Sequence, residues 1–143
     1  MFHKPLIFSN LEEIIAFETT RIGGISPHPF EGLNLGRSSG DEPENVLENK
    51  RLLAKALDIR PEQFVTGHQT HGDEVILIKK AGNFNGFDAK ISNERGLYLT
   101  VTVADCVPTL IFDKKKQSHR GCPRWLAGLG SWPGRQDFAK NGG

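Results

Sequence analysis

Alternating apolar and polar positions mark the clearest predicted strand, LYLTVTVADC at residues 97–106. Its aliphatic side chains would share one face of a sheet: Leu97, Leu99, Val101 and Val103. Tyr98 and the two threonines would lie on the other face, because side chains alternate along a strand. VPTLIFD (107–113) predicts a continuing strand, in which Pro108 indicates a bulge or a sheet edge.

Apolar residues at helical spacing predict one helix, PENVLENKRLLAKAL at residues 43–57. Its buried stripe would consist of Val46, Leu53 and Leu57. Asp41 followed by Glu44 fits a variant of the capping box, and Pro43 falls in the first turn, where its missing N–H costs nothing. We therefore expect the helix to begin at a defined point.

The remaining elements are short and mostly extended. PLIF (5–8) predicts a strand, IAFETT (15–20) is rich in β-forming residues, and FVTGHQTHGDEVILIKK (64–80) predicts a strand, a polar turn and a strand. SPHPFEGLNLG (26–36) carries two prolines and two glycines and predicts an ordered loop. Many strands with few helices indicate the α+β class, with mixed β-sheets covered by helices.

The pattern stops at Lys114. The segment from Ser118 to Gly143 has six glycines, two prolines and both tryptophans of the chain, without a sustained period of strand or helix. A flexible tail would account for the glycines, but disordered segments carry few aromatic residues. We therefore divide the chain into a domain at 1–117 and an aberrant tail at 118–143.

Composition narrows the function classes. A length of 143 residues suits one domain, and 18 Lys and Arg against 17 Asp and Glu do not favour a nucleic-acid-binding protein. The sequence has no apolar run long enough to span a membrane and does not begin like a signal peptide, so we expect a cytoplasmic location. Two cysteines, Cys106 and Cys122, do not make a disulfide framework.

Two segments carry candidate chemistry. HQTHGDEV (68–75) places His68 and His71 in a turn between strands, and ADC places Asp105 and Cys106 at a strand end. Imidazole and thiolate are natural zinc ligands, yet a catalytic zinc site needs three protein ligands. A lone cysteine after an apolar strand is also typical of a small buried hydrophobic residue. The residues alone leave both interpretations open.

Other polar residues have weaker support. Arg21, before two glycines, could bind a phosphate or simply be exposed. Asn34 in LNLG is either a substrate contact or a left-handed turn residue. Asp88 in FDAKIS is interpreted as a turn cap. Cys122, near His119 and Arg120, could be an activated thiol, but no other residue supports that role.

Six motifs together resemble the YfiH-type laccase-domain family, also called multicopper polyphenol oxidases. In order they are TTRIGGIS, SPHPFEGLNLG, GDEPENVLENKRLLAKAL, HQTHGDEV, FDAKIS and LYLTVTVADCVPTLIFD. The resemblance covers residues 1–113 and implies an α+β fold. It implies a zinc site of His, Cys and His, in which His71 and Cys106 match two ligands and would be the catalytic residues.

The resemblance also implies activities. Members catalyse phosphorolysis of adenosine, inosine and methylthioadenosine and deamination of adenosine, and older descriptions give copper-dependent phenol oxidation. Some bacterial members are linked to editing of peptidoglycan precursors. The implied partners are purine nucleosides and phosphate, with Arg21 and Asn34 as substrate-binding residues.

The tail departs from the family, which continues with His-Ala-Gly-Trp-Arg-Gly and its third zinc ligand. Here GCPRWLAG stands instead. Codons allowed by residues 119–129, read one base later, can encode Ile-Ala-Gly-Ala-His-Ala-Gly-Trp-Arg-Gly, with the histidine codon spanning Pro123 and Arg124. We therefore expect a frameshift after about residue 117, weak or absent zinc binding, and poor solubility from exposed strand edges.

Two alternatives remain. A copper-dependent phenol oxidase would need many imidazoles, and the chain has five histidines, scattered along its length. A fragment without catalytic function would also retain His71 and Cys106, so these residues do not separate it from an impaired enzyme.

Overall fold

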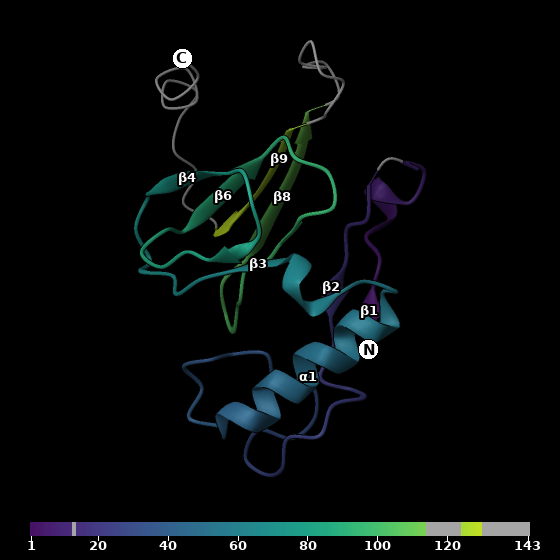
Figure 1. Ribbon diagram of the computed structural model, residues 1–143, viewed down its shortest axis with the longest axis vertical. Coiled ribbons are helices and arrows are strands. Elements are labelled where there is room, and N and C mark those ends of the chain that lie inside the picture. The colour runs from purple at the N-terminus through teal and green to yellow at the C-terminus, as the bar shows by residue number, and fades with distance from the viewer. Residues whose placement is uncertain (13, 114–123, 130–143) are drawn as a thin grey trace. The chain divides into compact units, whose positions relative to one another are not determined.

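The computed structural model describes residues 1–12, 14–113 and 124–129, the last of these by their backbone. The chain divides into two compact units, at Met1–Pro61 and Glu62–Gly143, which are described separately. Figure 1 shows one long helix in the first unit and most of the strands in the second. Helix and strands together confirm the α+β class. No helix in the described ranges is long and apolar enough to cross a membrane.

The first unit begins with a small antiparallel ribbon. Strand β1 (Phe2–His3) pairs with β2 (Glu18–Thr19). Between them, the strand predicted at 5–8 is wrong, since Leu6–Phe8 forms a 3-10 turn, η1. The Ser9 N–H and hydroxyl both donate to the Leu6 carbonyl, at 3.1 and 2.7 Å, and these local bonds replace a strand ladder.

Helix α1 (Pro43–Ala56) confirms the predicted helix within one residue. Its N-cap is Glu42, which makes no side-chain capping bond, so the predicted capping box is wrong. Asp41 lies one residue earlier and instead accepts hydrogen bonds from Glu42 N and Asn45 Nδ2, at 2.8 and 3.1 Å. The helix buries four side chains, with Asn49 in place of the predicted Leu57: Val46, Asn49, Leu53 and Ala54.

The second unit begins within the short 3-10 turn η2 (Pro61–Gln63) and contains two sheets. In the smaller, β3 (Phe64–Thr66) lies between β5 (Gly82–Asn83) and β7 (Tyr98–Leu99), all parallel. The larger has the order β4-β6-β9-β8. It comprises β4 (Val75–Ile78), β6 (Ala89–Ser92), β9 (Arg124–Leu129) and β8 (Pro108–Asp113).

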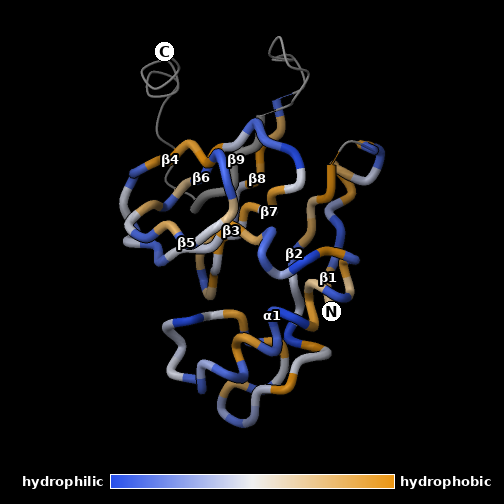
Figure 2. The backbone as a smooth tube through the Cα atoms, viewed as in Figure 1, coloured by the Kyte–Doolittle hydropathy of each residue, from blue (hydrophilic) through white to orange (hydrophobic). Residues whose placement is uncertain are grey.

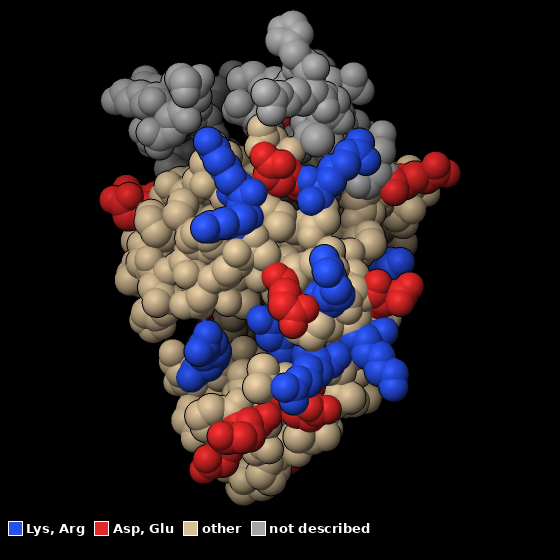
Figure 3. Space-filling model, in the orientation of Figure 1, with Lys and Arg blue, Asp and Glu red and all other residues tan. Residues whose placement is uncertain are grey.

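The cores of the two units are small. The first buries aliphatic side chains that include Leu33 and Leu53, and the second buries Phe64, Val65 and Ile78. Figure 2 shows apolar residues interspersed with polar ones along α1 and the strands. On the face shown in Figure 3, basic and acidic side chains are also interspersed, in keeping with a net charge of +1.

The predicted strand at 97–106 is mostly wrong, because only Tyr98–Leu99 pairs as a strand. Beyond it, side chains and isolated contacts satisfy the backbone. Thr100 donates from both its N–H and its hydroxyl to the Val65 carbonyl, at 3.1 and 2.8 Å. The Lys90 ammonium donates to the Thr100 carbonyl at 3.1 Å. The alternating sequence therefore does not continue as a strand here, because hydrogen bonds with other parts of the chain satisfy its backbone groups.

Strand β8 confirms the strand predicted at 107–113, and it lies at the end of the four-stranded sheet, where Pro108 is tolerated. Strand β9 was not predicted. It falls within the segment expected to be an aberrant tail, yet it pairs antiparallel with both β6 and β8. The rest of that segment, including His119 and Cys122, lies outside the described residues.

Candidate functional site

The turn that carries His71 connects β3 to β4, as the sequence predicts. His71 is exposed and has a φ of 58°, so it occupies the left-handed region, which residues other than glycine rarely adopt. His68, also exposed, begins the same turn, and its N–H donates to Asn85 Oδ1 at 2.9 Å. The turn thus presents imidazoles at the surface on a constrained backbone.

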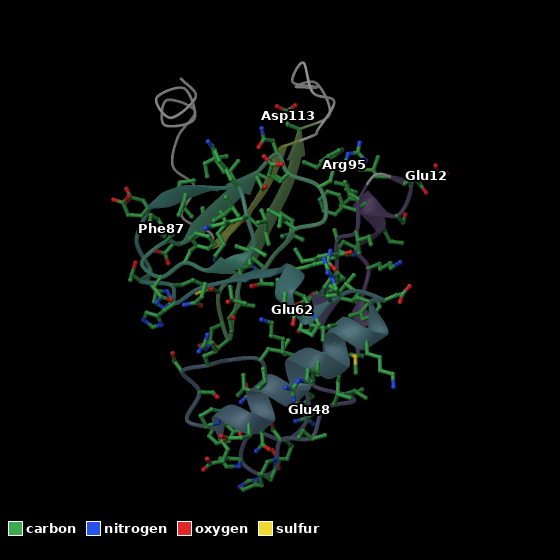
Figure 4. All side chains as sticks on the ribbon, in the orientation of Figure 1. Glu12, Glu48, Glu62, Phe87, Arg95 and Asp113 are labelled. Atoms are coloured by element: carbon green, nitrogen blue, oxygen red, sulfur yellow. The ribbon has the colours of Figure 1, made fainter. Side chains whose placement is uncertain are left out.

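Asp88 holds this turn. Its Oδ1 accepts from the N–H groups of Thr70 and His71, at 3.0 and 2.8 Å. Its Oδ2 accepts from the Thr70 hydroxyl and the Gly72 N–H, both at 2.9 Å. Asp88 is only 3% exposed and directly precedes β6, next to Phe87, which Figure 4 labels. The interpretation of Asp88 as a turn cap is confirmed.

The charge of Asp88 is stabilised by these bonds. Burial alone would raise the pKa of its carboxyl group, but the hydrogen bonds from Gly72, Thr70 and His71 outweigh burial and lower it. Lys90 is fully buried in β6, and burial lowers the pKa of its ammonium group while the negative charge of Asp88 partly opposes that change. Asp88 and Lys90 therefore interact electrostatically next to the turn that Asp88 holds.

The segment that leads to Cys106 is tied to the His71 turn. Gln69 Nε2 donates to the Thr102 carbonyl at 3.0 Å, and Gln69 Oε1 accepts from the Thr102 N–H at 2.8 Å. This pair joins the two segments two residues before His71 and four residues before Cys106. Cys106 is a free, exposed cysteine, so the alternative that it is a buried small hydrophobic residue is wrong.

The donor chemistry of these two residues suits zinc. Imidazole nitrogen and thiolate sulfur are common zinc ligands, and both side chains are exposed on segments that Gln69 connects. Within the described ranges, no three His, Cys, Asp or Glu residues gather closely enough to hold a metal ion. The described part of the chain therefore offers two candidate ligands, His71 and Cys106, where a catalytic zinc site needs three.

Arg21 and Asn34 both lie in the first unit. The Arg21 carbonyl accepts from the Leu33 N–H at 2.6 Å, so the backbone of Arg21 lies beside the residue that precedes Asn34. The Arg21 side chain is exposed, and its positive charge contributes, after the His28 hydrogen bond and other causes, to a lowered pKa of Glu31. An acidic neighbour reduces the attraction of this arginine for an anion.

The Asn34 amide is occupied within its own loop. Its Nδ2 donates to Ser39 Oγ at 2.8 Å and to Asp41 Oδ2 at 3.0 Å, while its Oδ1 accepts from the Gly36 N–H at 3.0 Å. The positive-φ residues other than glycine in the described chain are Asp58 and His71, so the left-handed alternative for Asn34 is wrong.

Sequence reasoning did not single out Asn49 or Lys90. Asn49, fully buried on α1, accepts from Ile25 N and donates to Ser26 Oγ, Gly32 O and Asn34 O, at 2.8 to 3.1 Å. The position of Asn49 on the apolar stripe of the helix was the sequence feature that could have indicated a buried polar residue. Lys90 had no signal, since a lysine in a short strand is typical of an exposed face.

The fold and the exposed His71 and Cys106 define the class: an α+β protein with two candidate metal ligands. The chain belongs to the family described as multi-copper polyphenol oxidoreductase laccase, whose sequence profile matches residues 15–121. A purine nucleoside phosphorylase of Streptomyces coelicolor is 39% identical over 118 residues, covering 78% of this chain and 49% of that protein. One of Corynebacterium glutamicum is 39% identical over 99 residues, covering 66% and 40%.

Solved structures have the same fold. YlmD from Geobacillus stearothermophilus superposes with a TM-score of 0.68 at 30% identity, covering 78% of this chain and 43% of that one. YfiH from Bacillus licheniformis gives 0.67 at 24% identity, with 76% and 42% covered. The chain therefore spans about half the length of the relatives it matches. The resemblance to the YfiH-type family is confirmed.

Proposed function

We propose that this chain derives from a zinc-dependent purine nucleoside phosphorylase of the laccase-domain family and is impaired in that activity. The observation that carries the proposal is the pair of exposed His71 and Cys106, on segments that Gln69 ties together, in a chain whose relatives bear that name. The substrates would be adenosine, inosine or methylthioadenosine with phosphate, and adenosine deamination would be a second activity. The expected location is the cytoplasm.

In phosphorolysis, a phosphate oxygen forms a bond to the sugar C1′ as the bond from C1′ to the purine nitrogen breaks. The electron pair of that bond leaves with the purine, which takes up a proton. His71 and Cys106 would hold the zinc ion, which acts as a Lewis acid when bound. Arg21 is the candidate for contact with phosphate or ribose. Asn34 would hold the loop that Arg21 begins, because its amide is already hydrogen-bonded there.

The impairment follows from the ligand count. We infer that residues 118–143 are the product of a shifted reading frame that removed the third ligand. Sequencing the gene across the codons for Asp113 to Arg124 tests this directly. A shifted frame that runs on through His-Ala-Gly-Trp-Arg-Gly is the expected result, and its absence would show that residues 118–143 are encoded in the genuine reading frame.

Activity is tested on the purified chain with zinc, phosphate and inosine or adenosine. We expect less than one zinc per chain and release of free base well below that of the Streptomyces coelicolor relative assayed in parallel. One zinc per chain with equal phosphorolysis would show that the chain is not impaired. Oxidation of phenols by the copper-loaded chain, without phosphorolysis, would favour the alternative of a copper-dependent phenol oxidase. Absence of both activities would favour the alternative of a fragment without catalytic function.

A further inference from the structure

The residues at the start of β6 hold the turn that carries His71 in two ways, through the Asp88 side chain and through backbone hydrogen bonds. On the side-chain side, the Asp88 carboxylate accepts four hydrogen bonds from three consecutive residues, 70 to 72. On the backbone side, the N–H groups of Asp88 and Ala89 donate to the Glu74 carbonyl, at 3.0 and 3.1 Å. The register Val75↔Ala89 then continues into the parallel pairing of β4 with β6. The turn is thus closed onto one strand end.

The Asp88 carboxylate is saturated. A carboxylate offers about four lone-pair positions on its two oxygens, and here each oxygen accepts two hydrogen bonds. Because the group is 3% exposed as well, it is not available to bind a metal ion or a substrate. Its effect on chemistry must act through the turn that it holds.

The turn needs such a hold because of His71. A φ of 58° is unfavourable for a histidine, and strained backbone persists where the surroundings determine it. The His71 N–H makes the shortest of the four bonds to Asp88, at 2.8 Å, so the strained residue is itself tethered. The exposed imidazole projects from this fixed backbone.

We propose that Asp88 is a positioning residue, which fixes the left-handed backbone of His71 and thereby the position of its imidazole as a metal ligand. The second half of this statement rests on the proposed function, whereas the first half does not. Carboxylates around metal ligands commonly contribute about 10- to 100-fold to metal affinity. Asp88 would do so through the ligand's backbone rather than through its ring.

The test compares Asp88→Asn with the unmodified chain, both labelled with ¹⁵N. Asparagine has nearly the same shape, but its Nδ2 cannot accept from the N–H groups that face it. We expect the HN–Hα coupling of His71, which reports φ, to change and the amides of residues 70 to 72 to exchange at least about 10-fold faster. We also expect zinc affinity, measured by competition with a chelator, to fall about 10-fold or more.

The matched control is Asp41→Asn in the first unit. Asp41 also accepts four hydrogen bonds, from Ser26, Asn34, Glu42 and Asn45, all of which belong to the first unit. It should leave the coupling, the exchange and the zinc affinity unchanged. If Asp88→Asn fails to fold, Thr70→Val removes one of the four bonds from an exposed position and should speed amide exchange in the turn about 2- to 10-fold.

The outcomes separate the two proposals. An unaltered His71 coupling and unaltered amide exchange in Asp88→Asn, or in Thr70→Val where the first variant does not fold, would overturn the positioning role. A changed turn with zinc affinity equal to that of the unmodified chain would overturn its link to the metal ligand. If the unmodified chain binds no zinc, the zinc assignment of His71 fails in this chain, and the coupling and exchange still decide whether Asp88 fixes the turn.

Discussion

His71 combines an exposed side chain with a backbone conformation that other residues rarely adopt. Its φ of 58° costs about 1 kcal/mol relative to a glycine at the same position. Asp88 compensates for this cost with a hydrogen bond to the His71 N–H.

Two replacements of His71 that both remove the imidazole measure the energetic cost of its positive φ. We expect His71→Gly to be more stable than His71→Ala by about 1 kcal/mol, because glycine adopts positive φ without a steric penalty. Urea denaturation of the two variants measures the difference. A matched pair at His68, which has no positive φ, should show no such advantage for glycine. Equal stability of the two His71 variants would contradict the assigned conformation.

Asp41 makes the first unit sensitive to acid. The hydrogen bond from Ser26, followed by those from Asn45, Asn34 and the Glu42 backbone, lowers the pKa of its carboxyl group below 3.8 despite an opposing effect of burial. A lowered folded-state pKa means that the ionised group stabilises the fold above pH 3.8 and that this contribution is lost as the pH falls through the folded-state pKa.

We therefore expect Asp41→Asn to reduce stability at neutral pH. Below about pH 4, the stability of this variant should fall less steeply with decreasing pH than that of the unmodified chain. Thermal unfolding of the variant and the unmodified chain between pH 2.5 and 7 measures this change. Glu48→Gln is the control, since Glu48 belongs to an exposed pair with Arg51 and has little to lose. An acid-dependent loss equal to that of the unmodified chain would contradict the role of Asp41.

At the scale of elements, strand β9 determines how the four-stranded sheet is closed. It lies between β6 and β8, with Ala127 opposite Lys90 on one side and Leu110 on the other. Without β9, both neighbours would present unpaired backbone groups, which favour aggregation. A segment with no predicted structure thus contributes an interior strand.

A proline tests this strand through its backbone alone. We expect Ala127→Pro to destabilise the second unit by about 1–3 kcal/mol, because proline removes a ladder N–H and leaves its acceptor without a partner in an interior strand. Ala127→Val is the matched control, since it keeps the N–H and suits a strand. Hydrogen exchange of the β6 and β8 amides measures the effect. Protection of those amides in the proline variant would show that β9 does not pair as described.

At the scale of the whole molecule, the proposed function predicts how the chain responds to zinc. The described residues offer His71 and Cys106, and a ligand that binds only the folded state raises its stability in proportion to affinity and concentration. We expect excess zinc to leave the thermal midpoint of this chain nearly unchanged. A gene with the reading frame restored should yield a protein whose midpoint rises by several degrees.

The control for that comparison is the restored protein carrying His71→Ala, which should lose the zinc-dependent rise. A rise of equal size in the chain as it stands would show that it binds zinc without the third family ligand. Restoration of the frame without any response to zinc would contradict the assignment of zinc to this family member.

Local pattern was sufficient where an element depends on its own residues. Apolar spacing and Pro43 located α1 within one residue, and the order of six motifs identified the family. The polar turn that contains His71 was located from the pattern between two strands. Asp88 was predicted as a turn cap from its place before a strand, although the residues that it caps lie 16 to 18 positions earlier in the sequence.

Long-range contacts decided the rest. The alternating stretch after Leu99 is not a strand, because the side chains of Lys90 and Gln69 bond its backbone from distant positions. The link between the His71 turn and the Cys106 segment depends on the same kind of contact, as does the pairing of β9. The sequence by itself determined which groups are present. Tertiary structure decided which backbone groups those side chains satisfy, because a buried donor or acceptor must find a partner wherever the fold brings one.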